Sequence, residues 1–557
     1  MPSLPLHRRR FLAGAVAAGA AAAWSPYGLR LRDAEAQALP LGVSFDPAPF
    51  TIGVASGDPA ADSVVLWTRV VDEPLLEDAQ EQMPEQVEVS WAIATDPRMR
   101  RVVNSGTTIA HRDFAHTVHV TADGLEPGQW YWYRFSALGK TSRIGRTKTA
   151  GGDRLRMAMV GCAKFHIGFF GAYRQLCRED IDLVFCSGDY FYEEPFDPSA
   201  ESDTREEDRL EETETLEQYR RRFALYRGDP NLRQAHTLFP WVVTWDDHEF
   251  DNNYAGTIRE DDDGPGQQSD SAFIARRANS YQAYYEMMPI RPPAGLPTGP
   301  DFVIHRTVRW GDLLDLVVLD TRQFRTDQPC DDATVSVTCA EVDDPDATIL
   351  GLDQRQWVMN ELSSSTAAWR TLGQQVLIAA IRAGGIPQQL QDSIAPALGA
   401  IDFTDGNYIN ADQWDGYQAE RAALLGHIAE EGIPDVTVLT GDIHSTWVSE
   451  LKPDFDNPLS PNVGVELCAT SITSSGFSQE EQTGLRPIFY ANNAHLKYFE
   501  GLSRGYMTAE VTADRWISRL RTIDDVYNPR PAITTKAEFV IERGTNAVTQ
   551  SIGTPFD

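Results

Sequence analysis

The sequence predicts an α/β fold combined with a smaller all-β part: a small β-sandwich comes first and a larger α/β domain follows. Between residues 47 and 150, short segments such as QVEVSWAIA alternate polar and apolar residues, which is typical of sandwich strands. From about residue 155, longer apolar runs alternate with helical stretches, which is typical of strands covered on both faces. At 557 residues the chain also exceeds the usual size of one core, so we expect two domains.

The first 38 residues have the features of a twin-arginine signal peptide. Arg8, Arg9 and Arg10 precede an Ala- and Gly-rich apolar run, and AQA at 36–38 offers a small-residue cleavage site. The run is too short for a stable membrane span. A disordered basic N-terminus is the alternative. We therefore expect export by the twin-arginine machinery and a periplasmic or secreted protein.

Residues 39–150 are assigned to the β-sandwich. The segment GLEPGQWYWYRF joins a turn to an aromatic strand, which resembles the corner of a fibronectin-like domain. We interpret His111, His116 and His119 in this part of the chain as ordinary strand residues and not as ligands. Residues 151–557, the predicted catalytic domain, supply the candidate ligands instead.

Polar residues stand where the apolar runs of this second part end. The runs RMAMVGC, DLVFCSGD, WVVTWDD and DVTVLTGDIH bring in Cys162, Asp189, Asp246 with Asp247, and Asp442 with His444. In open α/β sheets, ligands bind beyond the carboxyl ends of the strands. We therefore expect these side chains to converge on one crevice.

Charge and cysteine content narrow the class of protein. The formal net charge of -32 argues against a nucleic-acid partner, because phosphate backbones are bound by clustered Lys and Arg. Cys330 and Cys339 bracket the polar segment CDDATVSVTC, and we predict that they form a disulfide that closes a surface loop. Cys177, Cys186 and Cys468 lie in apolar surroundings, as expected for packed thiols.

The segment WVVTWDDHEFDNNY crowds acidic residues around His248, where like charges repel. A bound cation would offset this repulsion. The segment SGDYFY adds Asp189 and Tyr192, although a helix cap and a core residue would also explain these two. Together with a thiol and an imidazole, the set mixes polarisable donors, which favour a transition metal, with carboxylates, which favour calcium or magnesium.

An ordered set of motifs resembles the PhoD-type alkaline phosphatases across nearly the whole mature chain. The motifs are GVASGDP, VGC, GDYFY, TWDDHEFDNN, LDTRQFR, LGQQV, DQWDGY, GDIH, TSITSSG and RGY. The resemblance implies an N-terminal immunoglobulin-like β-sandwich followed by an α/β/β/α four-layer metallophosphoesterase domain. The segment GCAKFHIGFFGAY departs from the expected pattern after the cysteine, which leaves the roles of Lys164 and His166 open.

The resemblance also implies a ferric ion (Fe³⁺) together with calcium (Ca²⁺). Carried over to the matching positions, the iron ligands are Cys162, Asp189, Tyr192 and His444. Asp189 bridges to calcium, for which the ligands are Asp247 and Asp442, with Asp246 and Glu249 as further candidates and Asn279 placed by approximate position. Asp442 stands where many metallophosphoesterases have His, and the change to carboxylate favours calcium.

The chemistry expected at this centre is in-line displacement at phosphorus by a hydroxide held between metals. His248 is the candidate proton donor to the leaving oxygen, and the alternative is that it orients Asp247. Arg322 and Arg325 are candidate phosphate clamps, and the alternative is pairing with local acidic residues.

Three function classes follow from these residues. The first is an exported phosphatase that hydrolyses phosphate monoesters. The second is a phosphodiesterase or a phospholipase D-like enzyme of the same fold, so that the substrates are small-molecule or lipid phosphate esters. The third, a non-enzymatic exported calcium-binding protein, is disfavoured because Cys162 and Tyr192 accompany the carboxylates at the strand ends.

Overall fold

The computed structural model describes residues 41–196, 205, 212–260, 271–293, 299–332, 339–384, 407–457 and 459–553. The predicted signal peptide, residues 1–38, lies outside them. The chain from Pro40 onward forms one compact unit. Among the described residues, no helix has both the length and the apolar character needed to cross a membrane.

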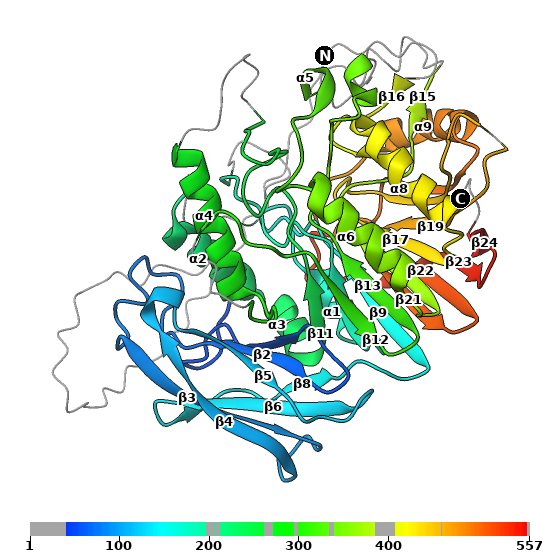
Figure 1. Cartoon of the computed structure of the whole chain (residues 1–557). Coiled ribbons are helices and arrows are strands. Elements are labelled where there is room, and N and C mark those ends of the chain that lie inside the picture. Colours follow the sequence, from blue (N-terminus) through cyan, green and yellow to red (C-terminus); the bar gives the residue numbers. More distant parts are fainter. Residues whose placement is uncertain are drawn as a thin grey trace, which may run out of the picture. The chain divides into compact units, whose positions relative to one another are not determined.

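The first of two large sheets gathers strands from both ends of the described chain (Figure 1). Its order is β24-β23-β22-β21-β9-β10-β11-β1-β2-β5, and β9, β10 and β11 run parallel. The strands are β1 (Val54–Gly57), β2 (Val64–Arg69), β5 (Thr117–Ala122), β9 (Arg154–Val160), β10 (Leu183–Cys186), β11 (Pro240–Val243), β21 (Arg504–Thr512), β22 (Arg515–Ile523), β23 (Ile533–Glu542) and β24 (Val548–Ile552).

The second large sheet has the order β12-β13-β14-β17-β19-β18-β20. Four neighbouring strands, β13, β14, β17 and β19, run parallel. The strands are β12 (Arg306–Trp310), β13 (Leu314–Val318), β14 (Trp369–Gly373), β17 (Val436–Thr440), β18 (Thr446–Leu451), β19 (Gly464–Cys468) and β20 (Leu496–Glu500).

The strand sequences explain how the two sheets pack. On β9, Met157 and Met159 join an apolar cluster with β13, β17 and β19 of the second sheet, whereas Ala158 and Val160 join a cluster with helices. The strand is therefore covered on both faces, as its continuous apolar run predicts. A third cluster packs α6 and α8 against the other face of the second sheet.

Helices α2 and α3 begin at residues whose side chains cap them. At α2, Thr215 and Gln218 form a reciprocal capping box, and Asp229 caps α3 in front of Pro230. The helices are α1 (Gly171–Leu176), α2 (Leu216–Arg227), α3 (Pro230–Leu238), α4 (Ser271–Met287), α5 (Pro329–Asp332), α6 (Gly351–Ser364), α8 (Gln418–Glu430) and α9 (Gln479–Asn492), with short 3-10 turns η1 (Arg112–Phe114), η2 (Ala340–Asp343) and η3 (Trp414–Gly416).

The N-terminal strands divide between two sheets that enclose an apolar cluster. β1, β2 and β5 extend the first large sheet, and they face a smaller sheet of order β4-β3-β6-β7, in which β8 also pairs with β6. The smaller sheet contains β3 (Gln86–Ala94), β4 (Val102–His111), β6 (Trp130–Ala137), β7 (Lys140–Thr141) and β8 (Gly145–Lys148). A domain boundary at residue 150 remains a prediction, and across it β1 pairs directly with β11.

The predicted disulfide is confirmed, because Cys330 and Cys339 are bonded. Of the three histidines expected in strands, His111 and His119 lie in β4 and β5, whereas His116 lies just before β5. The short hairpin formed by β15 (Arg382–Ala383) and β16 (Asn407–Tyr408) lies beside the cavity described below.

Candidate metal centre

The polar residues that follow β9, β10, β11 and β17 converge, as the sequence predicts. Their ligand atoms form three groups, and within each group the atoms lie within 4.8 Å of one another. The groups are Cys162 with Asp189 and His444, Asp189 with Asp247 and His248, and Asp246 with Asp247 and Asp442. Asp189 and Asp247 each belong to two groups, so the three groups form one continuous centre.

At one end of the centre, a phenol lies among the other donors. The Tyr192 hydroxyl donates to Asp189 Oδ2 over 2.8 Å and lies 3.0 Å from Nε2 of His444. Ser474 Oγ lies 2.7 Å from the same hydroxyl, and Cys162 Sγ lies 3.7 Å from the carbonyl oxygen of Asp442. Thiol, phenol, imidazole and carboxylate are therefore gathered at this end.

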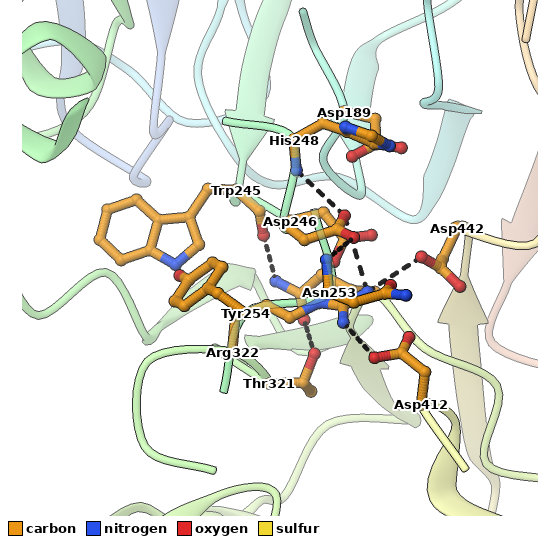
Figure 2. A network of polar contacts seen from close by, with 12 residues as sticks. Asp189, Trp245, Asp246, His248, Asn253, Tyr254, Thr321, Arg322, Asp412 and Asp442 are labelled. Carbon is orange, nitrogen blue, oxygen red and sulfur yellow. Dashed lines mark hydrogen bonds and ion pairs between the residues drawn. The ribbon is translucent and has the colours of Figure 1, made fainter. Parts of the chain in front are cut away.

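At the other end, one guanidinium is enclosed by carboxylates (Figure 2). Arg322 is fully buried, and its nitrogens donate to Asp246 over 2.5 Å, to Asp412 over 2.6 Å and to Asp442 over 2.9 Å. The phosphate clamp predicted for Arg322 is not the arrangement seen, because its guanidinium points at carboxylates and does not line the cavity. The alternative, pairing with nearby acidic residues, describes both Arg322 and Arg325, which also pairs with Asp412 at 3.0 Å.

The donor set fits bound cations. Among the described residues, Asp189 Oδ1 and Asp246 Oδ2 are buried side-chain oxygens without a hydrogen-bond donor. Burial raises the pKa values of Asp246, Cys162 and Tyr192 well above their usual ranges, and the neighbouring acids raise them further. Buried acids that repel one another in the protein alone become stable anions when a cation lies among them.

The backbone holds four of these residues in an uncommon conformation. Cys162, Asp189, Asp442 and His444 have φ angles of 53°, 50°, 63° and 51°, in the left-handed region. Each costs roughly 1–3 kcal/mol, and such strain concentrates at functional sites. Close approach of the loops makes the preceding glycines necessary, because a Cβ at Gly188 would lie 2.5 Å from Cβ of Asp246.

Glu249, a further candidate for calcium, instead connects two of the strand-end loops. Its Oε2 accepts from the backbone N–H groups of Asp189 and Asp246 over 2.9 and 2.8 Å. Its Oε1 accepts from the N–H of Tyr190 over 2.5 Å. This buried carboxylate, whose pKa burial raises to about 8, therefore holds the loops after β10 and β11 together.

His248 is held by a carboxylate outside the ligand groups. Its Nδ1 lies 2.8 Å from Glu193 Oε2, and Glu193 Oε1 accepts from the backbone N–H of Asn252 over 2.9 Å. The His248 ring lies 4.0 Å from the ring of Tyr192, and its backbone N–H donates to Asp247 over 3.0 Å. Burial lowers the pKa of His248, but Glu193 and Asp247 outweigh this and raise it.

A cavity of about 400 Å³ opens at this centre. That volume lies within the roughly 300–1,000 Å³ typical of small-molecule sites. Asp189, Asp247, His248, Asp442 and His444 line the cavity. Predicted site residues that follow three strands, β10, β11 and β17, therefore face the same space.

Several residues of the site were not singled out from the sequence. Asp412 and Gln413 open the motif DQWDGY, and Gln413 donates to Asp442 over 2.6 Å. Asn253 lines the cavity and donates its backbone N–H to Asp247 over 2.8 Å. In contrast, Asn279 bonds the carbonyl of Glu214 at the surface and is not among the described residues that line the cavity.

The sequence left the roles of Lys164 and His166 open, and the structure shows the contacts of both. Lys164 pairs with Glu194, and its Nζ lies 5.3 Å from the ring centre of Tyr192. His166 is fully buried beside Phe196, with 6.2 Å between the ring centres.

Comparisons with known proteins agree with this geometry. Residues 157–520 match the family described as PhoD-like phosphatase, and residues 34–151 match the PhoD-like phosphatase N-terminal domain. The chain is 41% identical over 507 residues to alkaline phosphatase D of Bacillus subtilis (strain 168), covering 90% of this chain and 82% of that protein. A solved structure described as the structure of PhoD is similar with a TM-score of 0.81 and 38% identity, covering 92% of this chain and 93% of that one.

Proposed function

Because the chain belongs to the PhoD-like phosphatase family, it is a phosphatase, and we propose that it is an exported, metal-dependent enzyme that hydrolyses phosphate esters at the centre described above. The observation that carries the proposal is that three linked groups of candidate ligands come together from separate strand ends beside one cavity. Buried carboxylate oxygens without a donor, among the described residues, support cations as the missing partners.

We propose Fe³⁺ and Ca²⁺ as these cations. Cys162, Asp189, Tyr192 and His444 would hold the iron, and Asp247 and Asp442, with Asp246, would hold calcium next to Asp189. Polarisable donors at one end and carboxylates at the other support this division. When bound, the cations would supply activation of water for in-line attack and neutralisation of the phosphoryl oxygens.

The chain's own residues would hold the ligand carboxylates in place and protonate the leaving oxygen of the substrate. Glu193 fixes Nδ1 of His248, so that Nε2 would be the ring nitrogen that gives a proton to the leaving oxygen. Arg322 would hold Asp246, Asp412 and Asp442 at fixed positions and offset their mutual repulsion. Arg322 thus acts as a positioning residue and not as a phosphate ligand.

The finer architecture belongs to the same proposal. We propose a twin-arginine signal peptide over residues 1–38, an immunoglobulin-like sandwich over 39–150 and a four-layer α/β/β/α catalytic domain over 151–557. The clusters between the two large sheets and beneath the helices support the four layers. The cluster beneath the smaller sheet supports the sandwich.

The proposal is tested on protein purified after native export. Elemental analysis should find iron and calcium, and ferric iron bound to a thiolate or phenolate should give a visible absorption band. Removing calcium with a chelator should abolish hydrolysis of p-nitrophenyl phosphate, and added calcium should restore it. An active enzyme that is colourless and free of iron would overturn the metal assignment.

The same purified enzyme can be used to decide whether phosphate monoesters or phosphate diesters are the preferred substrates. The motifs specify metals and phosphorus but not the leaving group, so a phosphodiesterase or phospholipase D-like activity uses the same residues. Comparing kcat/KM for p-nitrophenyl phosphate and for bis-p-nitrophenyl phosphate decides between them. Metal-loaded enzyme that turns over neither ester would contradict the proposed function as a whole.

A further inference from the structure

The lining of the cavity at the metal centre has two unlike parts. One part carries the carboxylates and imidazoles described above. The other part, named the apolar wall here, consists of Ile381, Ile409, Ile443, Phe477, Leu485 and Phe489, which belong to one apolar cluster. A ligand that fills the cavity therefore contacts both a polar and an apolar surface.

The apolar wall is rigidly supported from behind. Leu485 and Phe489 stand four residues apart on α9 and so share one face of the helix. Phe489 packs against Trp447 and Phe499, with 5.1 Å between ring centres in each pair. Ile409 donates its backbone N–H to the carbonyl of Ile381 over 3.2 Å. The wall is therefore preformed, which lowers the entropy cost of binding against it.

The apolar wall starts next to the proposed metal ligands. Ile443 lies between Asp442 and His444 in the chain, and its half-buried side chain packs against the same cluster as Leu485 and Phe489. A phosphate ester bound at the centre would consequently have this surface of carbon atoms beside it. The group on the ester oxygen is the alcohol of the substrate.

The same surface disfavours polar alcohols. A sugar or polyol would bury hydroxyl groups against Leu485 and Phe489, which offer no hydrogen-bond partner, and an unpaired buried hydroxyl is costly. Asp415, which also lines the cavity, is already engaged by Arg421 and by the N–H of Ile381.

Further negative charge on the alcohol is also disfavoured. Among the described residues that line the cavity, none is Lys or Arg. The net charge of the whole chain is -32, so a second phosphate on the substrate would meet a repulsive field beyond the metals. Nucleoside polyphosphates and sugar bisphosphates therefore fit this cavity poorly.

We infer that the apolar wall is the binding site for the alcohol part of the substrate, and that the enzyme acts on phosphate esters of uncharged alkyl or aryl alcohols. This inference rests on the proposed function and names its substrate class. It assigns specificity to Leu485, Phe489 and Ile409, none of which lies among the metal-ligand candidates.

Binding of n-alkylphosphonates tests the inference without catalysis. These molecules keep the phosphoryl oxygens and cannot be hydrolysed at an ester bond. Calorimetric titration of the metal-loaded enzyme with methyl-, propyl- and hexylphosphonate should show the affinity rising by about threefold to fourfold per methylene group. Equal affinity for the three compounds would overturn the inference.

Variants locate the effect on the apolar wall. Leu485→Asn keeps the size of the side chain but makes it polar, so the gain per methylene should fall by at least half, while the affinity for inorganic phosphate stays unchanged. Leu352→Asn is the matched control, because Leu352 lies on α6 and is 68% exposed. Ile409→Asn, at a half-buried position, repeats the test should Leu485→Asn fail to fold.

Kinetics distinguish a failure of this inference from a failure of the proposed function. The wild-type enzyme should hydrolyse phenyl phosphate with a kcat/KM at least tenfold above that for glycerol 2-phosphate, and Leu485→Asn should reduce this ratio mainly through KM. Equal kcat/KM for both esters would overturn the inference and leave the phosphatase intact. No turnover of either ester, together with alkylphosphonate affinity that rises with chain length, would overturn the proposed function and leave the apolar binding site standing.

Discussion

The backbone is strained at four of the proposed ligands, because Cys162, Asp189, Asp442 and His444 have left-handed φ angles. Hydrogen bonds from the surroundings offset this strain: Glu249 receives the N–H of Asp189, and Ser474 donates to the carbonyl of Cys162 over 2.9 Å. The donors are therefore arranged before any ion arrives. Binding of an ion to such a preformed set stabilises the folded state by mass action.

Glu193 offers a residue-scale test of the proposed proton donor. Glu193→Gln weakens the partner of His248 Nδ1, so kcat should fall by roughly 10–100-fold, the range typical of residues that orient a ligand or base. KM and metal content should stay close to wild type. Steady-state kinetics measure kcat and KM, and elemental analysis measures the metal content.

Glu361→Gln serves as the control for Glu193→Gln. Glu361 on α6 pairs with Arg309 over 2.7 Å and does not line the cavity, so its loss should leave kcat within about twofold. If Glu193→Gln instead loses its metals, Glu193 supports the ligand set as a whole and the assigned role of His248 is wrong.

His495 makes folding stability depend on pH. Its Nε2–H donates to the carbonyl of Ala380 over 2.7 Å, and burial lowers its folded pKa from 6.5 to about 4. The unfolded chain therefore binds the proton first as pH falls, so the contribution of neutral His495 is fully present above pH 6.5 and is lost toward pH 4. The loss amounts to at most about 3 kcal/mol.

His495→Gln keeps a donor for Ala380 but does not titrate in this range. The variant should lose less unfolding free energy than the wild type between pH 7 and pH 5, as measured by denaturant titration at both values. Equal losses in the two proteins would show that His495 does not cause the dependence.

At the scale of elements, the centre depends on how closely loops after different strands approach one another. Glu249 ties the loop after β10 to the loop after β11, and Arg322, which follows β13 in the second sheet, reaches Asp246 in the first. The site is therefore assembled across both large sheets. A small displacement of one loop therefore moves candidate ligands in more than one of the three groups.

Gly188→Ala tests this close approach. The new Cβ would lie 2.5 Å from Cβ of Asp246, and φ at this position is +120°, so the loops after β10 and β11 must separate. We expect lower iron content in elemental analysis and a loss of at least about 2 kcal/mol of stability. Gly139→Ala is the control, because Gly139 also has a positive φ but would place its Cβ in open space. Equal behaviour of the two variants would mean that strain, and not loop contact, is what matters.

The sequence could predict which side chains lie at strand ends but not which partners they meet across the two sheets. Apolar runs ending in Cys162, Asp189 and Asp442 revealed which side chains lie at strand ends, because that depends on local pattern alone. The partners of Arg322 depend on how two sheets meet, and no local pattern specifies this. Asp412 was missed for the same reason: it follows no apolar run, and its contacts to the centre are made through residues such as Arg322 and Gln413.

At the scale of the whole molecule, the N-terminal strands and the catalytic strands share one sheet. β1 pairs in parallel with β11, and β2 and β5 continue the sheet outward. Trp67 on β2 donates its indole N–H to the carbonyl of Glu286 at the end of α4 over 2.7 Å. The two predicted domains are therefore bound together by backbone pairing as well as by side chains.

Without residues 39–150, residues 151–557 should consequently fail to fold as an independent domain. Without β1, β11 becomes an unprotected sheet edge, and such edges promote aggregation. We expect the fragment 151–557 to be insoluble or aggregated in size-exclusion chromatography, whereas a chain lacking only residues 1–38 should be soluble and active. A monomeric, active 151–557 fragment would contradict this expectation.

The strand order of the first large sheet has a consequence for how the protein is made. β9, which leads to Cys162, pairs with β10 on one side and with β21 on the other, and β21 begins only at Arg504. A ribosome synthesises β21 long after β9, so one edge of β9 stays open until Arg504 and the residues after it have been made. Secretion during synthesis would separate these partners across a membrane, whereas the export proposed above, if it carries the folded chain, keeps them together.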